Sequence, residues 1–208
     1  WSSDVCSSDL NKFGYSDNIG VRRSMEDSFI IRESTGPLIP SLYGVIDGHG
    51  GYQSSSISAS LIPVLFEQSE TKLIVDMSTI LKQVNEQLYK KQVSDGAAVV
   101  LALVTPSSIS VAHLGDARAL IVKKDGSVAT LTYDHKPTER SELDVLKDGR
   151  AFVASERLSS HLAISRAIGD FMIDGVSRTP DMTRYDITSN DYRLVLACDG
   201  VFDVMNNN

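Results

Sequence analysis

The chain has 208 residues, of which 42% are hydrophobic and 23% are charged, and its formal net charge is −7. This length and composition predict a globular chain with one domain and a sizeable hydrophobic core. The acidic balance argues against a general nucleic-acid or anionic-membrane binder, and no apolar run approaches the roughly 18 residues that a membrane span needs. We therefore expect neither nucleic acid nor membrane among the partners.

The first ten residues, "WSSDVCSSDL", show neither helical nor strand periodicity and resemble the translation of a DNA-sequencing adapter. We predict that residues 1–10 are a non-native leader and that residues 11–208 form one domain. Cys6 then carries no information, and Cys198 lies in an apolar run that is typical of a small buried side chain. Without a disulfide framework or a CxxC pattern, the sequence predicts an intracellular protein, cytoplasmic or nuclear.

The first half of the chain is predicted to contain one buried strand and two helices. The apolar run "SLYGVID" (41–47) leads into an Asp-Gly turn signal and is typical of a buried strand. Apolar residues recur at helical spacing through residues 51–66 and through residues 78–92, where Ser78 is the expected N-cap.

Strand signals dominate the second half of the chain. Residues 97–104 form a continuous apolar run, as expected for a strand buried on both faces, and residues 108–132 alternate strands with two turn signals. A short helix closed by Gly149 and a central strand over residues 192–200 are also predicted.

The order of these elements predicts an α+β fold with two antiparallel sheets packed face to face and helices outside. Helices cluster early and again near residues 141–148, whereas strands dominate elsewhere. A doubly wound parallel sheet fits less well, because strand and helix do not alternate along the chain.

Aspartates recur where buried segments reach the surface, each beside a glycine. The four are Asp47, Asp116, Asp170 and Asp199. Each alone is typical of turn chemistry, but strand ends on a common edge can bring such side chains together. Converging carboxylates repel one another unless a cation compensates, and an all-oxygen set favours Mg²⁺ or Mn²⁺ over zinc.

The segment "GVRRSMEDSF" (20–29) combines two arginines with two acids. Neighbouring residues of a strand face opposite ways, so one arginine and one acid are expected on the same face. An arginine near a metal site indicates an oxyanion ligand, most naturally a phosphate, because its planar fork binds two oxygens. A surface charge cluster is the alternative.

Six motifs occur in order along the chain: "RRSMEDSF", "YGVIDGHGG", "AHLGDARALIV", "DHKP", "LAISRAIGDF" and "LVLACDGVFDVM". In these motifs, from about Phe13 to Met205, the chain resembles the metal-dependent serine/threonine protein phosphatases of the 2C type. The resemblance implies a central antiparallel β-sandwich flanked by helices, with two Mn²⁺ or Mg²⁺ ions at one end. It also implies that a water shared by the two ions attacks phosphoserine or phosphothreonine.

The resemblance assigns roles to five residues of the site. Asp47 matches the acid that bridges both metals, Gly48 matches a backbone carbonyl ligand, and Asp199 matches a direct ligand of the other metal. Arg22 matches the phosphate-binding arginine. His49 matches the histidine that protonates the leaving alkoxide, a contribution of about 10²–10⁴-fold where general acids have been measured.

Further acids are carried over with accessory roles. Glu26 and Asp27 match acids that hold metal-bound waters, and Asp116 and Asp203 match residues of a weaker third metal site. For the pair Arg166 and Asp170 we expect a structural role, with the acid bonding backbone near the site. The "DHKP" motif (134–137) is expected to stabilise the turn before a helix, and the short segment 150–161 leaves peptide specificity open.

The chain departs from the family pattern at its end. The late Asp-Asn motif, which supplies a further ligand to the metal bound by Asp199, has no counterpart after Met205. The expectation is a C-terminally truncated domain with an incomplete sandwich and little activity.

Two rival functions remain open from sequence. The first is a catalytically weak or inactive phosphatase-like scaffold, which usually loses metal ligands or the phosphate arginine. The second is a two-metal hydrolase of nucleotides or nucleic acid, which the acidic charge disfavours. Catalysis on a phosphoprotein is the preferred interpretation, because the five residues of the site are all present. A monomer is expected.

Overall fold

The computed structural model describes residues 13–36, 39–69, 76–145 and 151–207, so the predicted leader and Gly149 lie outside the described residues. Strands and helices follow one another along these ranges. In chain order they are β1 (Ser28–Arg32), β2 (Ser41–His49), α1 (Gln53–Gln68), α2 (Met77–Lys90), β3 (Gly96–Val104), β4 (Ser108–Leu114), β5 (Arg118–Lys123), β6 (Val128–Thr130), α3 (Arg140–Val145), β7 (Val153–Ala154), β8 (Arg157–Leu158), β9 (Ile168–Gly169), β10 (Asp181–Asp186), β11 (Asp191–Ala197) and α4 (Asp199–Phe202).

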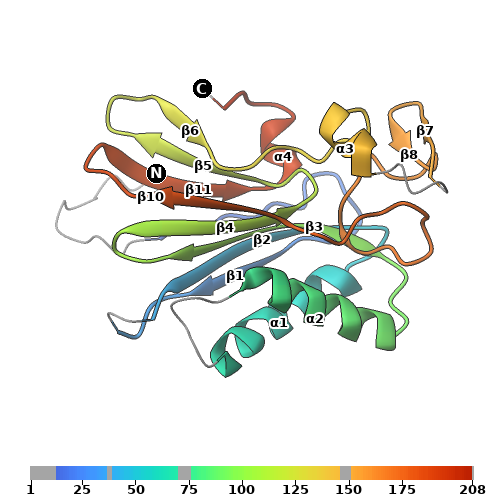
Figure 1. The fold of residues 1–208 in the computed structure, drawn as a ribbon, viewed down its shortest axis with the longest axis horizontal. Helices are drawn as coiled ribbons and strands as arrows, with labels where there is room; N and C mark the ends of the chain where they lie inside the picture. The colour runs from blue at the N-terminus through green and yellow to red at the C-terminus, as the bar shows by residue number, and fades with distance from the viewer. Residues whose placement is uncertain (1–12, 37–38, 70–75, 146–150, 208) are drawn as a thin grey trace.

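Two antiparallel sheets form the central layers of the molecule (Figure 1). The larger sheet has the strand order β1-β2-β3-β4-β10, with the short β9 also paired to β3, and the smaller sheet has the order β11-β5-β6. Strands β7 and β8 form a separate hairpin. Helices α1 and α2 cover the face of the larger sheet that is turned away from the smaller sheet (Figure 1). The arrangement confirms the predicted α+β fold with packed antiparallel sheets.

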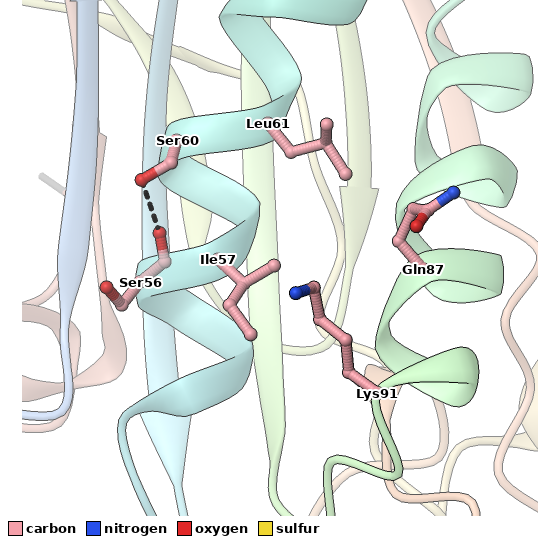
Figure 2. Close-up of a pocket in the computed structure, with 6 residues that line it drawn as sticks. All are labelled: Ser56, Ile57, Ser60, Leu61, Gln87 and Lys91. Carbon is pink, nitrogen blue, oxygen red and sulfur yellow. Dashed lines mark hydrogen bonds between the residues drawn. The ribbon is translucent and has the colours of Figure 1, made fainter.

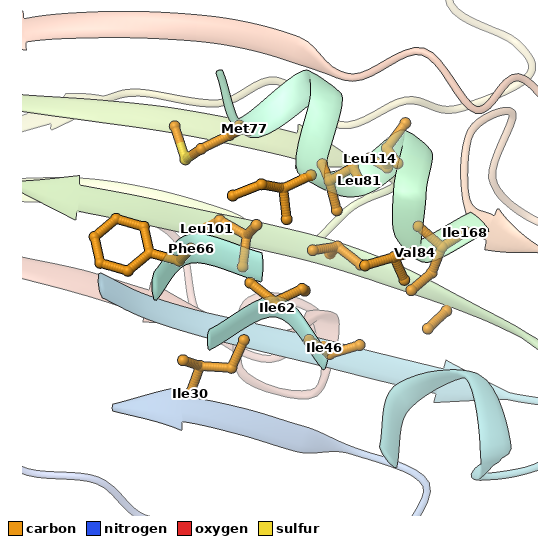
Figure 3. Packing of buried hydrophobic residues seen from close by; sticks show 14 of the residues in the cluster. Ile30, Ile46, Ile62, Phe66, Met77, Leu81, Val84, Leu101, Leu114 and Ile168 are labelled. Atoms are coloured by element: carbon orange, nitrogen blue, oxygen red, sulfur yellow. The ribbon is translucent and has the colours of Figure 1, made fainter. Parts of the chain in front are cut away.

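One hydrophobic core fills the space between the larger sheet and its two helices (Figure 3). Ile62 and Phe66 of α1 and Leu81 of α2 are completely buried there, against strand residues such as Ile46. Burial alternates along β2, as the two-residue period of a strand requires, so Ile46 faces the helices. Asp47, the next residue, therefore faces the side on which the smaller sheet lies.

A second core lies between the two sheets. Val100 and Val111 of the larger sheet and Ala119 and Ile121 of the smaller sheet are almost completely buried in it. Strand β3 contributes to both cores, which confirms the prediction that residues 97–104 form a strand buried on both faces. Among the described helices, none combines the length and the apolar character that crossing a bilayer requires.

The N-cap of helix α2 lies two residues earlier than the sequence indicates. Its N-cap is Asp76, not Ser78: the Asp76 carboxylate accepts hydrogen bonds from the Ser78 backbone N–H at 3.0 Å and from Thr79 Oγ1 at 2.7 Å. The prediction of Ser78 as N-cap is therefore wrong. A carboxylate is the stronger choice at this position, because it compensates both the free N–H groups and the helix dipole.

Two further expectations differ from the structure. Strand β11 is an edge strand and not a central one, since within the described residues it pairs with β5 alone. Residues 20–27 are not a strand; they form a turn and an irregular segment that leads into β1. The strand argument about which of their side chains share a face therefore does not apply.

Candidate active site

The predicted acids converge at one end of the sandwich. Asp47 lies near the end of β2 in the larger sheet, and Asp199 opens α4 directly after β11 of the smaller sheet. Ligand atoms of Asp47, Asp199 and Cys198 all lie within 4.8 Å of one another. The two sheets thus each deliver one carboxylate to a shared point.

The charges at this point repel one another. Burial, followed by the negative charges of Asp27, Asp199 and Asp116, raises the pKa of Asp47 from 3.8 to about 8. Burial and the charges of Asp116 and Asp203 also raise the pKa of Asp199. Several carboxylates that converge in this way are the oxygen donors that a hard divalent cation such as Mg²⁺ or Mn²⁺ prefers. The residues present therefore fit a divalent metal.

Gly48 lets two backbone segments approach closely beside these acids. A Cβ on Gly48 would overlap the carbonyl oxygen of Glu26. The same carbonyl accepts a hydrogen bond from Ser55 Oγ of helix α1. This contact fixes Glu26 and the adjacent Asp27 against the end of β2.

Cys198 is half-buried and lies among the acids, so its predicted place as a small buried side chain needs correction. Its Sγ lies 3.6 Å from Asp27 Oδ2. Burial and the charges of Asp47 and Asp27 raise the pKa of the thiol to about 11. The thiol is therefore neutral at physiological pH and is a weak nucleophile.

Asp116 lies at the same end but has its own cation. It is buried, and the Lys136 ammonium donates a hydrogen bond to its Oδ2. Burial lowers the pKa of Lys136, but the bond and charge of Asp116 outweigh this, so the pKa rises overall. The acid assigned to a third metal site is thus ion-paired with a residue of the "DHKP" segment.

His49 is the last residue of β2, and its ring is held by Asp170, an acid that was expected near the site but in contact with backbone. Asp170 Oδ2 lies 2.7 Å from His49 Nε2. The expectation that the Asp170 carboxylate bonds backbone is therefore wrong. Burial alone lowers the pKa of His49, but the hydrogen bond and charge of Asp170 outweigh burial, and the pKa is raised.

Several features give Asp170 its position. It adopts a left-handed backbone conformation with φ of 49°, directly after Gly169. Gly96 lies opposite His49 in the sheet, and a Cβ on Gly96 would overlap the Asp170 carboxylate. Arg178 donates to the backbone carbonyls of Gly169 and Asp170, both at 3.0 Å.

Asp95 is a residue that sequence reasoning missed. Its carboxylate accepts hydrogen bonds from the backbone N–H groups of Gln53 at 2.9 Å and Ser54 at 2.8 Å, so it caps helix α1 from a distant segment. Its backbone carbonyl accepts a bond from Asp170 N–H at 3.2 Å. The only sequence signal was the Asp95-Gly96 turn dipeptide before β3.

The remaining predicted residues are more peripheral. Arg22 is exposed, and its backbone N–H closes a turn onto Ile19. The Glu26 carboxylate accepts a bond from Ser24 Oγ at 3.1 Å, on the exposed side. Asp203 is exposed at the end of α4, where its N–H bonds the Asp199 carbonyl at 2.7 Å.

A second set of metal-ligating side chains has hydrogen bonds that suit neutral imidazoles instead. The rings of His113 and His135 stack with centroids 4.4 Å apart, near Asp181. The Gly115 N–H donates to His135 Nδ1 at 3.0 Å, so the proton of His135 lies on Nε2 and points to Asp181. That proton occupies the nitrogen a metal would need. Burial, then the neighbouring charges of His113 and Arg166, lowers the pKa of His135 to about 4.

Arg166 completes this network in the structural role that was expected. It donates to both Glu142 oxygens, at 2.8 and 2.6 Å, and to Asp181 Oδ1 at 2.7 Å. The network therefore ties α3 to β10.

A pocket of about 330 Å³ lies elsewhere, between α1 and α2 (Figure 2). Ile57 and Leu61 of α1 face Gln87 and Lys91 of the α2 side across it. None of its lining residues is among the predicted site residues. This pocket therefore lies apart from the acidic end of the sandwich.

Comparison with known proteins points to one family. The family profile described as "Protein phosphatase 2C" matches residues 11–208. The chain is 29% identical over 211 residues to "Protein phosphatase 1L" of Bos taurus and 32% identical over 220 residues to "Probable protein phosphatase 2C 55" of Oryza sativa subsp. japonica. These matches cover 90% and 97% of this chain but 59% and 57% of the relatives, so the chain spans less than two thirds of their length.

Solved structures show the same likeness. A structure titled "Structure of a C.elegans sex determining protein" matches with a TM-score of 0.78 and 25% identity, over 89% of this chain and 50% of that one. A serine-threonine phosphatase 2C from Toxoplasma gondii matches with a TM-score of 0.70 and 22% identity, over 91% of this chain and 78% of that one. At that identity, the second match concerns the fold alone.

Proposed function

The chain belongs to the protein phosphatase 2C family, and from this premise we propose that it hydrolyses phosphoserine or phosphothreonine in a phosphoprotein, acting as a monomer. The observation that carries the proposal is the convergence of Asp47 and Asp199 from opposite sheets, with ligand atoms within 4.8 Å. The raised pKa of Asp47 supports it, because mutual repulsion of this kind is relieved by a bound cation.

Asp47 and Asp199 are the residues that would hold divalent cations, with the Gly48 carbonyl as a further oxygen ligand. We propose two Mn²⁺ or Mg²⁺ ions, with Asp116 and Asp203 serving a third and weaker site. When bound, such ions supply Lewis-acid chemistry, which activates a water molecule and offsets the charge of the phosphate. Asp27 lies beside this point, and we propose that Glu26 and Asp27 orient water through their carboxylates.

The other functional groups belong to the chain itself. Arg22, whose side chain is exposed, offers a planar guanidinium that can bind two phosphate oxygens. His49 has its Nε2 engaged by Asp170, so Nδ1 is the nitrogen that remains to serve the substrate. A proton on Nδ1 would pass to the alkoxide oxygen of serine or threonine as the P–O bond breaks.

A hydrolysis assay on this chain tests the proposal. Phosphopeptide turnover should require Mn²⁺ or Mg²⁺ and should fall by at least about 10²-fold in Asp47→Asn. Asp174→Asn changes an exposed aspartate and is the matched control, in which turnover should be unchanged. No turnover at saturating Mn²⁺, or equal turnover in Asp47→Asn, would contradict the proposal and favour a scaffold. Faster hydrolysis of a nucleotide than of a phosphopeptide would favour a nucleotide hydrolase.

A further inference from the structure

The "DHKP" segment does more than form a turn. His135 and Gly115 are joined by two hydrogen bonds, a contact called the clasp below. The His135 backbone N–H donates to the Gly115 carbonyl at 3.0 Å, and the Gly115 N–H donates to His135 Nδ1 at 3.0 Å. The next residue on each side is therefore fixed beside the other. These next residues are Lys136 and Asp116, and they form an ion pair.

The two partners of this ion pair differ in their access to water. The Lys136 side chain is 34% exposed, whereas the Asp116 side chain is 8% exposed. The ammonium can therefore swing into solvent, but the carboxylate cannot follow it. A buried carboxylate without a counter-charge is destabilising, so a cation beside Asp116 stabilises its charged form.

We propose that Lys136 is a tethered cation that occupies Asp116 until a divalent ion displaces it. The inference rests on the proposed function, because it concerns a metal ion at the same acidic end. Competition from Lys136 lowers the affinity of the third cation site, because an ion that takes Asp116 as a ligand must first break the ion pair between Lys136 and Asp116. The clasp between His135 and Gly115 keeps the ammonium within reach, so the competition is intramolecular.

The surrounding charges support this competition. Asp134 is a second acid of the same segment and lies two residues before Lys136. Asp134 is itself bound by Arg118 through two hydrogen bonds, at 2.7 and 2.9 Å, so its charge is already compensated. The Lys136 ammonium is therefore the cation that compensates Asp116.

Direct Mn²⁺ binding tests the proposal without any activity assay. Electron paramagnetic resonance measures free Mn²⁺, so the number of bound ions follows by difference from the total. The titration is made on the wild-type chain, on Lys136→Met and on Lys136→Arg. In Lys136→Met the weakest class of sites should bind about tenfold more tightly, because one competing positive charge is gone. Lys136→Arg keeps the charge and should change binding less than about twofold. Lys82→Met removes the same charge from the exposed face of α2 and should leave binding unchanged.

A double-mutant cycle separates the proposed contact from a general charge effect. In an Asp116→Asn background, Lys136→Met should give no gain in Mn²⁺ affinity, because the shared ligand is absent. Unchanged binding in Lys136→Met, or a gain that persists beside Asp116→Asn, overturns the role of Lys136 while leaving the proposed function standing. Failure of the wild-type chain and Lys136→Met to bind any Mn²⁺ overturns both.

A measurement on the unaltered chain guards against a variant that misfolds. The Lys136 side-chain signal, assigned by its loss in Lys136→Arg, can be followed by nuclear magnetic resonance during a Mg²⁺ titration. It should move together with the weakest binding phase, as the ammonium leaves Asp116 for solvent. A Lys136 signal that stays fixed while that phase fills would overturn the proposal.

Discussion

The Asp170 carboxylate lies 2.7 Å from Nε2 of His49, although 121 positions separate the two residues along the chain. The contact requires the left-handed backbone of Asp170 and the absence of a side chain at Gly96. It selects the nitrogen of His49 that remains free, and it fixes the rotation of the ring. Asp170 is thus a positioning residue for the group proposed to protonate the leaving alkoxide.

Replacement of Asp170 should affect substrates according to their leaving groups. Asp170→Asn should slow the hydrolysis of phosphoserine peptides by about 10²-fold, because a misplaced general acid loses most of its effect. An aryl phosphate, whose leaving group departs as a stable anion, should lose far less. Steady-state kinetics on the two substrates decides the point, and equal losses on both would indicate a general structural defect.

The titration of His49 should report the same contact. Its pKa should lie above the ordinary value of 6.5 in the wild-type chain and fall in Asp170→Asn. Because the folded pKa is the higher one, the stability from this pair is complete below about pH 6.5 and is lost as the pH rises through the folded value. Imidazole signals followed by nuclear magnetic resonance across this range measure the shift, and an unchanged pKa in the variant would count against the contact.

A methyl group at Gly96 should displace Asp170. In Gly96→Ala the new Cβ overlaps the Asp170 carboxylate, so the chain should lose about 1–3 kcal/mol of unfolding free energy, as overpacked sites do. Urea denaturation measures the loss. Gly126→Ala is an unsuitable control because its φ is 84°, whereas Gly14→Ala has open space and should change little.

Neutralising Asp47 should stabilise the chain when cations are removed. Because its pKa is raised from 3.8 to about 8, folding favours the protonated acid, and the stability from this group is lost as the pH rises through about 8. In EDTA at pH 8, Asp47→Asn should melt at least about 2–4 °C above the wild-type chain, the shift that about 1 kcal/mol gives at this size. At pH 5 the difference should shrink. A lower Tm at pH 8 would contradict the repulsion described above.

The start of α2 can be tested with two neighbouring substitutions. Asp76→Ala removes both capping hydrogen bonds and should cost about 1 kcal/mol of unfolding free energy. Ser78→Ala retains the cap and should leave the unfolding free energy unchanged or raise it slightly, because alanine has the higher helix propensity. Equal losses in urea denaturation would restore Ser78 as the capping residue.

The convergence of Asp47 and Asp199 could be predicted from sequence because it depends on local signals. Each acid directly follows an apolar run that is long enough for a strand and is followed by glycine. Antiparallel strands of two stacked sheets place such turns at a few common edges. The layers of the fold follow from the same order of apolar runs and turns along the chain, so they were also predictable.

The partners of Asp95, Asp170 and Lys136 could not be predicted, because each contact depends on the path of a distant segment. Asp95 caps a helix that begins at Gln53, and Asp170 reaches His49 only because β9 pairs with β3. The segment around Arg22 shows the converse error: an apparent strand proved to be a turn, because no partner strand lies beside it within the described residues.

Asp47 belongs to the larger sheet, and Asp199 follows the edge strand of the smaller sheet. The place where their carboxylates meet is therefore also an interface between the two sheets. An ion held by both carboxylates would cross-link the two sheets, in addition to their apolar packing and the contact between Cys198 and Asp27. Such a cross-link closes a long loop of the chain, so it lowers the conformational entropy of the state in which the two sheets have separated. Amide hydrogen exchange would then slow first along β2 and β11. The same bound ion that enables hydrolysis would therefore also hold the two sheets together.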